Sequence, residues 1–370
     1  MTQMKRNETR QVRCGDVLIG GGAPVSIQSM TNVDSRDAHA LTEQIARLAD
    51  AGCQIVRISV PDAEAAEVFG RVKRKFAHVP LVADIHFDYR MALEAIRQGA
   101  DKIRINPGNI GDAARVRAVV QAAKEREIPI RVGVNSGSLE KPILTKYGGV
   151  TAAALAESAL YNLKLIEDLG YDRLVVSLKS SDVAMNYEAH QLLAAQTDVP
   201  VHIGITEAGT PHRGKLKSAI GIGSLLLSGI GDTMRVSLTA DPVEEVFFAG
   251  EILRTLGLRA SSIDLVSCPT CGRTRIDLEA LAHAVEARLA PLEEALRAKG
   301  HPSIKVAVMG CAVNGPGEAK EADFGVAGGD GKGLLFAHGE IVKTAVPEAA
   351  LADELLALIQ ERIFRHETTD

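Results

Sequence analysis

Short apolar runs rich in β-branched residues alternate with amphipathic segments along most of the chain. Eight runs of strand length recur between residues 24 and 239. They are Pro24–Met30, Gln54–Val60, Leu81–Phe87, Lys102–Gly108, Ile130–Ser136, Arg173–Ser180, Val201–Glu207 and Thr233–Thr239. Stretches rich in Ala, Leu, Glu and Arg, with helical periodicity, separate them. This alternation is typical of a parallel sheet built from right-handed strand–helix–strand units.

Eight consecutive units of similar length predict a closed TIM (β/α)8 barrel. The distance between successive runs suits a strand, a helix and two loops, with one longer unit between Ile130 and Arg173. A doubly wound open sheet is the alternative. Such a sheet would not need eight near-equal units, and it usually opens on a phosphate-binding glycine turn. We therefore expect the barrel.

The strand–helix rhythm stops near residue 258, which predicts a second domain. Its expected elements are a strand at Ile263–Ser267, a helix at Asp277–Lys299, strands at Ile304–Met309, Phe324–Ala327, Leu334–His338 and Ile341–Ala345, and a helix at Leu351–Ile363. The glycine-rich run Gly328–Gly333 predicts a hairpin turn. The sequence therefore predicts a barrel over residues 1–258 and a small α/β domain over residues 259–370.

Composition and charge narrow the class of protein. The 370 residues are 46% hydrophobic and 24% charged, as in an ordinary globular protein, and the net charge is −5. That balance gives no sign of a nucleic-acid partner or of an anionic membrane surface. The start of the chain is polar, and no apolar run is long enough for a signal peptide or a membrane span. We expect a cytoplasmic protein in which Cys14 and Cys53 are ordinary buried thiols.

Polar side chains interrupt the predicted barrel strands, and most of the charged ones are cationic. The cationic or titratable ones are Arg57, His86, Arg104, Arg131, Lys179 and Arg235, and they are accompanied by Asp84, Asn106, Asn135, Ser177, Thr206, Glu207 and Ser237. A charge inside an apolar strand costs several kcal/mol unless it is paired or serves a ligand. Several guanidinium groups at one barrel mouth, with few acidic partners, indicate a polyanionic small molecule.

Glu207 and the lone histidines need separate interpretations. Glu207 ends the seventh predicted strand, where a buried carboxylate near the cations could donate or accept a proton. An ion pair with one of the arginines is an equally good interpretation. His39, His78 and His190 lie in helical or loop segments, and we expect them at the surface.

Three cysteines of the second domain have the spacing of a metal centre. Cys268 and Cys271 enclose two residues, and Cys311 follows a predicted strand. A 4Fe-4S cluster needs a fourth ligand, and Glu318 is the nearest carboxylate after Cys311. A zinc site suits the same spacing, with its fourth ligand from His283, His301 or His338. Spacing alone leaves cluster and zinc open.

Several motifs resemble those of the 4-hydroxy-3-methylbut-2-enyl diphosphate synthase family. They are Ser26–Asn32 (SIQSMTN), Ala83–Phe87 (ADIHF), Arg104–Asn109 (RINPGN), Gly133–Leu139 (GVNSGSL), Ser267–Gly272 (SCPTCG) and Gly310–Glu318 (GCAVNGPGE). The resemblance covers nearly the whole chain. It implies a 4Fe-4S cluster held by Cys268, Cys271, Cys311 and Glu318.

The resemblance also implies an activity. The family reduces 2-C-methyl-D-erythritol 2,4-cyclodiphosphate to a hydroxymethylbutenyl diphosphate in the methylerythritol phosphate route to isoprenoids, with electrons from reduced flavodoxin or ferredoxin. It forms a head-to-tail homodimer in which the cluster domain of one subunit caps the barrel of the other. We expect Glu207 and Glu318 to be catalytic. The expected substrate ligands are Arg57, His86, Arg104, Asn106, Arg131, Asn135, Lys179 and Asn314.

Two other classes of protein stay in view. A barrel transferase of the dihydropteroate synthase type would share the cationic strand ends and a diphosphate-bearing substrate, but it needs no cluster. A zinc or iron–sulfur module without catalysis would need only the cysteine domain and would leave the arginines idle.

Overall fold

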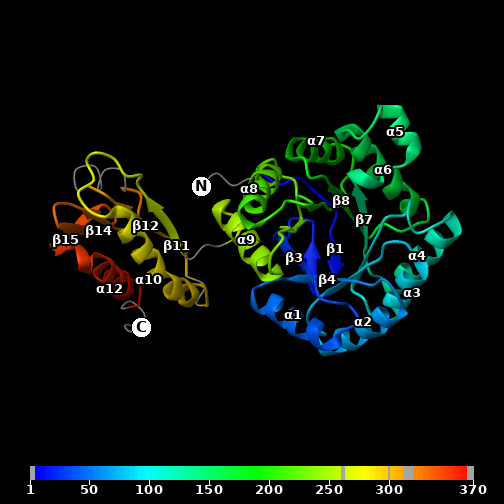
Figure 1. The fold of residues 1–370 in the computed structure, drawn as a ribbon, viewed down its shortest axis with the longest axis horizontal. Helices are drawn as coiled ribbons and strands as arrows, with labels where there is room; N and C mark the ends of the chain where they lie inside the picture. The colour runs from blue at the N-terminus through cyan, green and yellow to red at the C-terminus, as the bar shows by residue number, and fades with distance from the viewer. Residues whose placement is uncertain (1–4, 260–262, 299–300, 312–319, 365–370) are drawn as a thin grey trace. The chain divides into compact units, whose positions relative to one another are not determined.

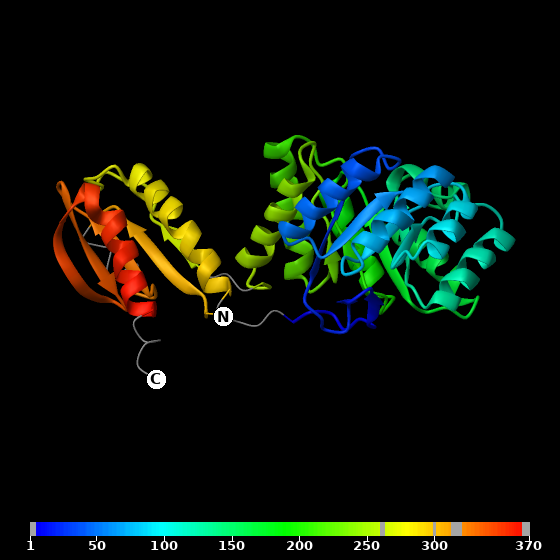
Figure 2. The ribbon, with the colours of Figure 1, turned by 90° about the horizontal axis from the view of Figure 1, so that it is seen from below.

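A computed structural model of the chain describes residues 5–259, 263–298, 301–311 and 320–364. Asn314 and Glu318, two of the predicted site residues, lie outside these ranges. The chain divides into two compact units, Met1–Arg259 and Ala260–Asp370, which Figures 1 and 2 show from two directions.

The first unit is a ring of eight parallel strands surrounded by helices (Figure 1). In spatial order the strands are β8 (Leu174–Lys179), β7 (Ile130–Asn135), β6 (Lys102–Ile105), β5 (Leu81–Asp84), β4 (Ile55–Ser59), β3 (Ser26–Met30), β10 (Thr233–Met234) and β9 (His202–Ile203). A parallel bridge between Val176 and Val201 joins the two ends of this order. The predicted barrel is confirmed.

Helices of the expected period follow the strands. They are α1 (Ala38–Asp50), α2 (Ala63–Lys75), α3 (Tyr89–Arg97), α4 (Ala113–Arg126), α5 (Lys141–Tyr147), α6 (Ala152–Glu167), α7 (Val183–Ala194), α8 (Pro211–Leu227) and α9 (Pro242–Thr255). Aspartates begin many of them: the Asp37 carboxylate accepts hydrogen bonds from the backbone of His39 and Ala40, which satisfies donors at the start of α1. The long unit after Ile130 contains two helices, α5 and α6, which explains its length.

The barrel strands alternate between an apolar outer side and a polar inner side. On β6 and β7, Ile103, Ile105, Val132 and Val134 belong to the hydrophobic core beneath the helices. Side chains at the intervening positions point to the opposite face of each strand, which is the barrel interior. The polar side chains at such positions are Gln28, Arg57, Asp84, Lys102, Arg104, Arg131, Ser177, Lys179, His202, Thr233 and Arg235. Bulky apolar side chains usually fill a TIM barrel, so this polar interior marks a site.

A β-hairpin that the sequence did not reveal precedes the barrel. Strands β1 (Val12–Cys14) and β2 (Val17–Ile19) pair antiparallel. Cys14 and Ile19 form a separate apolar cluster with Ile55, Val82 and Val175, which lie at or near the amino-terminal ends of their strands. The hairpin therefore covers the amino-terminal end of the barrel (Figure 2), and the opposite end remains for the site.

The second unit is a five-stranded sheet with two helices. The strands lie in the order β11 (Ile263–Ser267), β12 (Ile304–Met309), β13 (Phe324–Gly328), β14 (Lys332–Ala337) and β15 (Glu340–Pro347). The first three are parallel to one another, and the last three are antiparallel. Helices α10 (Leu278–Ala298) and α12 (Leu351–Phe364) pack in one core with these strands. The predicted hairpin turn between Gly328 and Gly333 is confirmed.

Other expectations have mixed outcomes. Cys14 and Cys53 are buried as predicted, and burial raises the pKa of their thiols to about 11 and about 12. The prediction for His190 is wrong: this residue of α7 is buried, and its Nδ1 lies 2.7 Å from the Asn186 carbonyl of the same helix. Burial lowers the pKa of His190 to about 4, so the ring is neutral. In the described part of the chain, no helix has both the length and the apolar character needed to cross a bilayer.

Candidate active site

A cavity of about 430 Å³ opens at the carboxyl-terminal end of the barrel. It is lined by Arg57, Asp84, His86, Arg104, Asn135, Ser136, Gly137, Ser138, Lys179, Thr206 and Glu207. Strands β4 to β9, or the loops that follow them, supply these residues. Chemistry in TIM barrels takes place at this end. Six of the residues predicted to be catalytic or to bind substrate thus lie around one cavity, and they are Arg57, His86, Arg104, Asn135, Lys179 and Glu207.

Asp84 is a buried carboxylate among the cations of this cavity. Its Oδ1 lies 3.4 Å from Arg104 Nη1, and its Oδ2 lies 3.8 Å from both Arg57 Nε and His86 Nε2. Burial acts to raise the pKa of Asp84, but Arg57 and Arg104 outweigh it and hold that pKa well below the usual range. The carboxylate is therefore ionised, yet its single charge leaves the two arginines with a positive excess.

Several guanidinium nitrogens in the barrel have no hydrogen-bond partner among the described residues. They are all three nitrogens of Arg131, Nη1 of Arg57 and Nε of Arg104. Arg131 is 0% exposed, and burial, followed by the charges of Arg57 and Arg104, lowers its pKa well below the ordinary value. An unsatisfied buried donor costs about 1–3 kcal/mol. This arrangement is therefore suited to an anionic ligand with several acceptor oxygens.

Lys179, at the end of β8, extends the positive surface toward the residues that follow β10. It lines the main cavity and also a small adjoining hollow, where Thr206, Arg235 and Ser237 meet it. Burial, and then the nearby arginines, lower the pKa of Lys179 well below its ordinary value. A bound anion would offset both effects and restore the charged form.

Gly133 on β7 makes room for Arg104. A Cβ atom at Gly133 would lie 2.5 Å from Arg104 Nε and 2.9 Å from its Nη2. Those distances are shorter than any ordinary contact between such atoms. The glycine therefore allows the guanidinium to lie across the neighbouring strand.

Glu207 was expected to be a buried carboxylate, and the structure shows it exposed. It is exposed at the rim of the cavity, and it makes no ion pair with a residue that the structure describes. Its backbone φ is +52°, which a residue with a side chain rarely adopts. Residues with a strained backbone of this kind are often found at functional sites. The ion-pair interpretation is not supported, and the conformation keeps Glu207 within the set of candidate catalytic groups.

Two predicted ligands are not among the residues that line the cavity. Arg131 lies in the barrel interior and is absent from the cavity lining. Asn106 is buried after β6, and its Oδ1 accepts a hydrogen bond from the Gly108 backbone at 3.1 Å. Asn106 therefore uses its Oδ1 within its own loop.

Lys102 is a buried cation that the sequence analysis overlooked. Its side chain is 0% exposed, and its Nζ has no partner among the described residues. The signal was present, because Lys102 and Arg104 are two positions apart on one strand and so face the same side. Burial lowers the pKa of Lys102 to about 8 from 10.5, and the charge of Arg131 acts in the same direction.

This burial predicts a pH-dependent stability change in Lys102→Met. The depressed pKa means that folding disfavours the protonated amine, and the cost is full below pH 8. The substitution should therefore stabilise the barrel by about 3 kcal/mol at pH 7. The gain should shrink as the pH rises from 8 toward 10.5, where the unfolded amine also loses its proton. Urea unfolding of both proteins across this range measures it, and a gain independent of pH would contradict the explanation.

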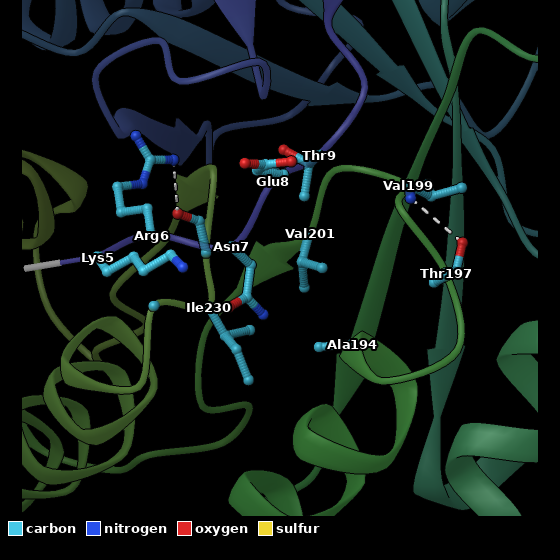
Figure 3. Close-up of a pocket in the computed structure, with 12 residues that line it drawn as sticks. Lys5, Arg6, Asn7, Glu8, Thr9, Ala194, Thr197, Val199, Val201 and Ile230 are labelled. Atoms are coloured by element: carbon cyan, nitrogen blue, oxygen red, sulfur yellow. Dashed lines mark hydrogen bonds between the residues drawn. The ribbon is translucent and has the colours of Figure 1, made fainter.

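A larger cavity, of about 600 Å³, lies at the opposite end of the barrel (Figure 3). Residues Lys5–Thr9 line it together with Val199, Val201 and Ile230, which come before strands β9 and β10. Arg6 lies on its wall, and its guanidinium is already bonded to Asp232 at 2.9 Å. Among the described residues that line it, none has a buried side-chain nitrogen without a hydrogen-bond partner, as the arginines of the barrel interior do, so its size does not make it the candidate site.

The cysteines of the second unit lie at the carboxyl-terminal ends of neighbouring strands. β11 and β12 are parallel, with Ser267 opposite Val308, so Cys268 and Cys311 leave the same edge of the sheet. The Gly310 backbone N–H donates a hydrogen bond to Cys268 Sγ over 3.2 Å. This bond shows that the two cysteine loops touch.

The loop of Cys271 is folded back by Thr274. The Cys271 N–H donates to Thr274 Oγ1 over 3.2 Å, and the Thr274 N–H donates to the Cys271 carbonyl over 2.9 Å. A Cβ atom at Gly310 would lie 3.0 Å from Thr274 Oγ1, so glycine allows the loops to approach. Hydrogen bonds from Arg273 lower the pKa of the exposed Cys271 thiol. The lowered pKa favours the thiolate form of Cys271, which is the form that binds metals.

The three histidines considered as zinc ligands have partners elsewhere. His283 lies beside Glu286, His301 Nδ1 lies 2.8 Å from the Pro302 carbonyl, and His338 lies beside Asp323. Within the described ranges, no three His, Cys, Asp or Glu side chains are grouped as metal ligands would be. Glu318 falls outside those ranges.

Comparison with known protein families shows to which family the chain belongs. Residues 9–250 match the family described as the GcpE TIM-barrel domain, and residues 264–361 match the GcpE protein C-terminal domain. The chain belongs to the GcpE family. The resemblance found in the sequence motifs is thereby confirmed, as is the order of a barrel followed by a smaller domain.

Relatives within the GcpE family are similar over nearly the full length. The 4-hydroxy-3-methylbut-2-en-1-yl diphosphate synthase (flavodoxin) of Geobacter sulfurreducens is 56% identical over 96% of this chain and 98% of its own. The enzyme of that name from Clostridium acetobutylicum is 55% identical over 95% of this chain and 98% of its own. A solved dihydropteroate synthase from Xanthomonas albilineans is 16% identical over 65% of this chain and 98% of that chain, with a TM-score of 0.48.

Proposed function

We propose that this GcpE-family chain reduces 2-C-methyl-D-erythritol 2,4-cyclodiphosphate to (E)-4-hydroxy-3-methylbut-2-enyl diphosphate and water. Relatives named for this product share more than half of its residues over almost the entire length. The observation that carries the proposal is the set of buried guanidinium nitrogens in the barrel, on Arg57, Arg104 and Arg131, that have no partner among the described residues. The dihydropteroate synthase-like transferase alternative is not favoured, since the GcpE family matches both units of the chain.

The barrel, residues 1–258, is proposed to bind the cyclic diphosphate. Arg57 and Arg104 line the cavity with a single buried carboxylate between them, so together they retain positive charge for phosphate oxygens. Lys179 completes the cationic wall, and Arg131 supplies further donors from beneath it. The proposed ligands also include His86, Asn106, Asn135 and Asn314.

The second unit, residues 259–370, is proposed to hold the 4Fe-4S cluster. Cys268, Cys271 and Cys311 would be its thiolate ligands, and Glu318 would be the fourth. The contact of the two cysteine loops supports this assignment, and so do the hydrogen bonds from Arg273 that lower the pKa of the Cys271 thiol from its ordinary value. When bound, such a cluster supplies electrons one at a time. A reducing cytoplasm, with reduced flavodoxin or ferredoxin as donor, suits three free cysteines.

Proton transfer is proposed to fall to groups at the rim of the cavity. The reaction adds two electrons and removes one oxygen as water, so protons must enter together with the electrons. Glu207 is exposed at the rim in a strained backbone conformation, and His86 lines the same cavity. Both groups can exchange protons with solvent while they face the substrate. Glu207 is the proposed proton donor.

Assembly as a head-to-tail homodimer is part of the proposal, with each cluster domain capping the barrel of the other subunit. Subunit complementation tests it: an inactive Cys271→Ala variant mixed with an inactive Arg131→Met variant should regain activity, because mixed dimers contain one intact site. With random exchange, roughly a quarter of the wild-type activity is expected. Absence of recovery despite subunit exchange, shown by a tagged partner, would contradict the shared site.

Metal content distinguishes the proposed enzyme from its alternatives. Anaerobically purified protein should contain iron and acid-labile sulfide and should show a broad visible absorption that reduction bleaches. Zinc in place of iron would favour a zinc-stabilised module. Protein that takes up neither metal during anaerobic reconstitution would favour the transferase.

A further inference from the structure

Glu245 on α9 is a buried carboxylate that the active-site assignment leaves unused. It is 3% exposed and accepts four hydrogen bonds. Arg235 supplies two of them, from Nε to Oε2 over 3.1 Å and from Nη2 to Oε1 over 3.2 Å. The Leu238 backbone N–H and Ser29 Oγ donate the other two over 2.9 and 3.2 Å. The carboxylate thus holds one edge of the guanidinium with both oxygens and links three segments of the chain.

The free side of the same guanidinium faces the mouth of the barrel. Arg235 lines the small hollow beside the main cavity, together with Lys179, Thr206 and Ser237. Its remaining nitrogen, Nη1, has the Met30 sulfur, at 3.6 Å, as its one hydrogen-bond partner among the residues that the structure describes. A thioether is a weak acceptor, so this nitrogen is available to a stronger one.

The uncharged sulfur of Met30 contacts the guanidinium groups of both Arg57 and Arg235 and neutralises neither charge. Its sulfur also accepts from Arg57, over 3.1 Å from Nε and 2.7 Å from Nη2. Two like charges around one sulfur repel each other, so an unrestrained Arg235 would turn away from Arg57. The bidentate bond to Glu245 opposes this movement, because two parallel hydrogen bonds fix the plane of a guanidinium.

We infer that Glu245 is a positioning residue that aims Arg235 at the diphosphate of the substrate. The inference rests on the proposed function for the identity of the ligand. Glu245 does not touch the substrate; it acts through Arg235. Glu245 increases the affinity by preorganisation, since an arginine already held in place loses little conformational freedom when the anion binds.

The experiment measures substrate affinity in a set of matched variants. Wild type, Glu245→Gln, Arg235→Met and the double variant are compared as cluster-loaded enzyme, by calorimetric titration with 2-C-methyl-D-erythritol 2,4-cyclodiphosphate and by KM and kcat. The control is Asp232→Asn, which changes another buried, arginine-paired carboxylate that lies just before β10 at the other end of the barrel. Thermal unfolding is recorded for all variants.

Glu245→Gln should weaken binding and raise KM about tenfold, with a smaller change in kcat. In the Arg235→Met background the same substitution should change affinity less than about twofold, because its effect passes through the missing arginine. Asp232→Asn should lose thermal stability yet bind like the wild type. Glu245→Asp, which keeps the charge but shortens the reach, should bind with intermediate affinity, and it replaces Glu245→Gln if that variant does not fold.

Three results would overturn the inference: unchanged affinity in Glu245→Gln, an equal loss with Arg235 absent, or an equal loss in Asp232→Asn. Failure of the wild type to bind the cyclodiphosphate would instead contradict the proposed function.

Discussion

Replacing Arg131 by methionine is expected to weaken binding of the cyclodiphosphate by ~2–5 kcal/mol, the range found when one partner of a buried charge pair is removed. This corresponds to a loss of roughly 30- to 5000-fold in affinity. The reason is that all three guanidinium nitrogens are buried without a partner among the described residues, so an anion is needed to satisfy them. Calorimetric titration measures the effect, and unchanged affinity would remove Arg131 from the site.

The same substitution should stabilise the protein without substrate. Methionine fills a similar volume and removes a buried charge whose pKa is already lowered by burial and by neighbouring arginines, so the gain should be about 1–4 kcal/mol. Arg173→Met is the control, because Arg173 is exposed and pairs with Glu127 at the surface; it should alter neither property. Loss of both affinity and stability in Arg131→Met would indicate a structural role and contradict the assignment to a ligand.

Replacing Glu318 by alanine is expected to remove the proposed fourth ligand of the proposed cluster. Iron content should fall toward roughly three atoms per chain, and turnover should drop by about 100-fold or more. The number of possible metal ligands is the reason for this expectation: the second unit has three cysteines, and Glu318 follows the last of them closely. Iron analysis and anaerobic turnover measure the two effects.

Glu318→Cys tests the same ligand from the other direction. A thiolate binds iron more firmly than a carboxylate, so this variant should retain all its iron and still lose most of its turnover. Glu321→Ala is the matched control, because Glu321 is an exposed carboxylate only three positions later; its iron content and turnover should equal those of the wild type. Full iron and full activity in Glu318→Ala would make Glu318 an ordinary loop residue.

The periodic pattern was enough to predict the barrel, because eight strands buried by surrounding helices must each carry an apolar outer side. The hairpin of β1 and β2 escaped prediction since its strands have three residues each and no measurable periodicity. The burial of His190 was equally hidden: a single polar residue in a helix has no period, and only packing in three dimensions places its ring inside.

The candidate site was predictable where a charge stood inside an apolar strand. Arg57, Arg104 and Lys179 were found in that way, and the structure places them around one cavity. Glu245 could not be found so, because a glutamate near the start of a helix is ordinary there and only its contact with Arg235 distinguishes it. The exposure of Glu207 and its left-handed backbone conformation could not be predicted either, because no residue pattern around it marks them.

The central claim is that this chain performs the reductive ring opening of the cyclodiphosphate. Its most direct test is anaerobic incubation of the iron-loaded protein with 2-C-methyl-D-erythritol 2,4-cyclodiphosphate and reduced flavodoxin, with the product followed by mass spectrometry. The account predicts (E)-4-hydroxy-3-methylbut-2-enyl diphosphate in amounts well above one per chain, with two electrons consumed per product. Substrate recovered unchanged by protein that contains its full iron and binds the cyclodiphosphate would contradict it.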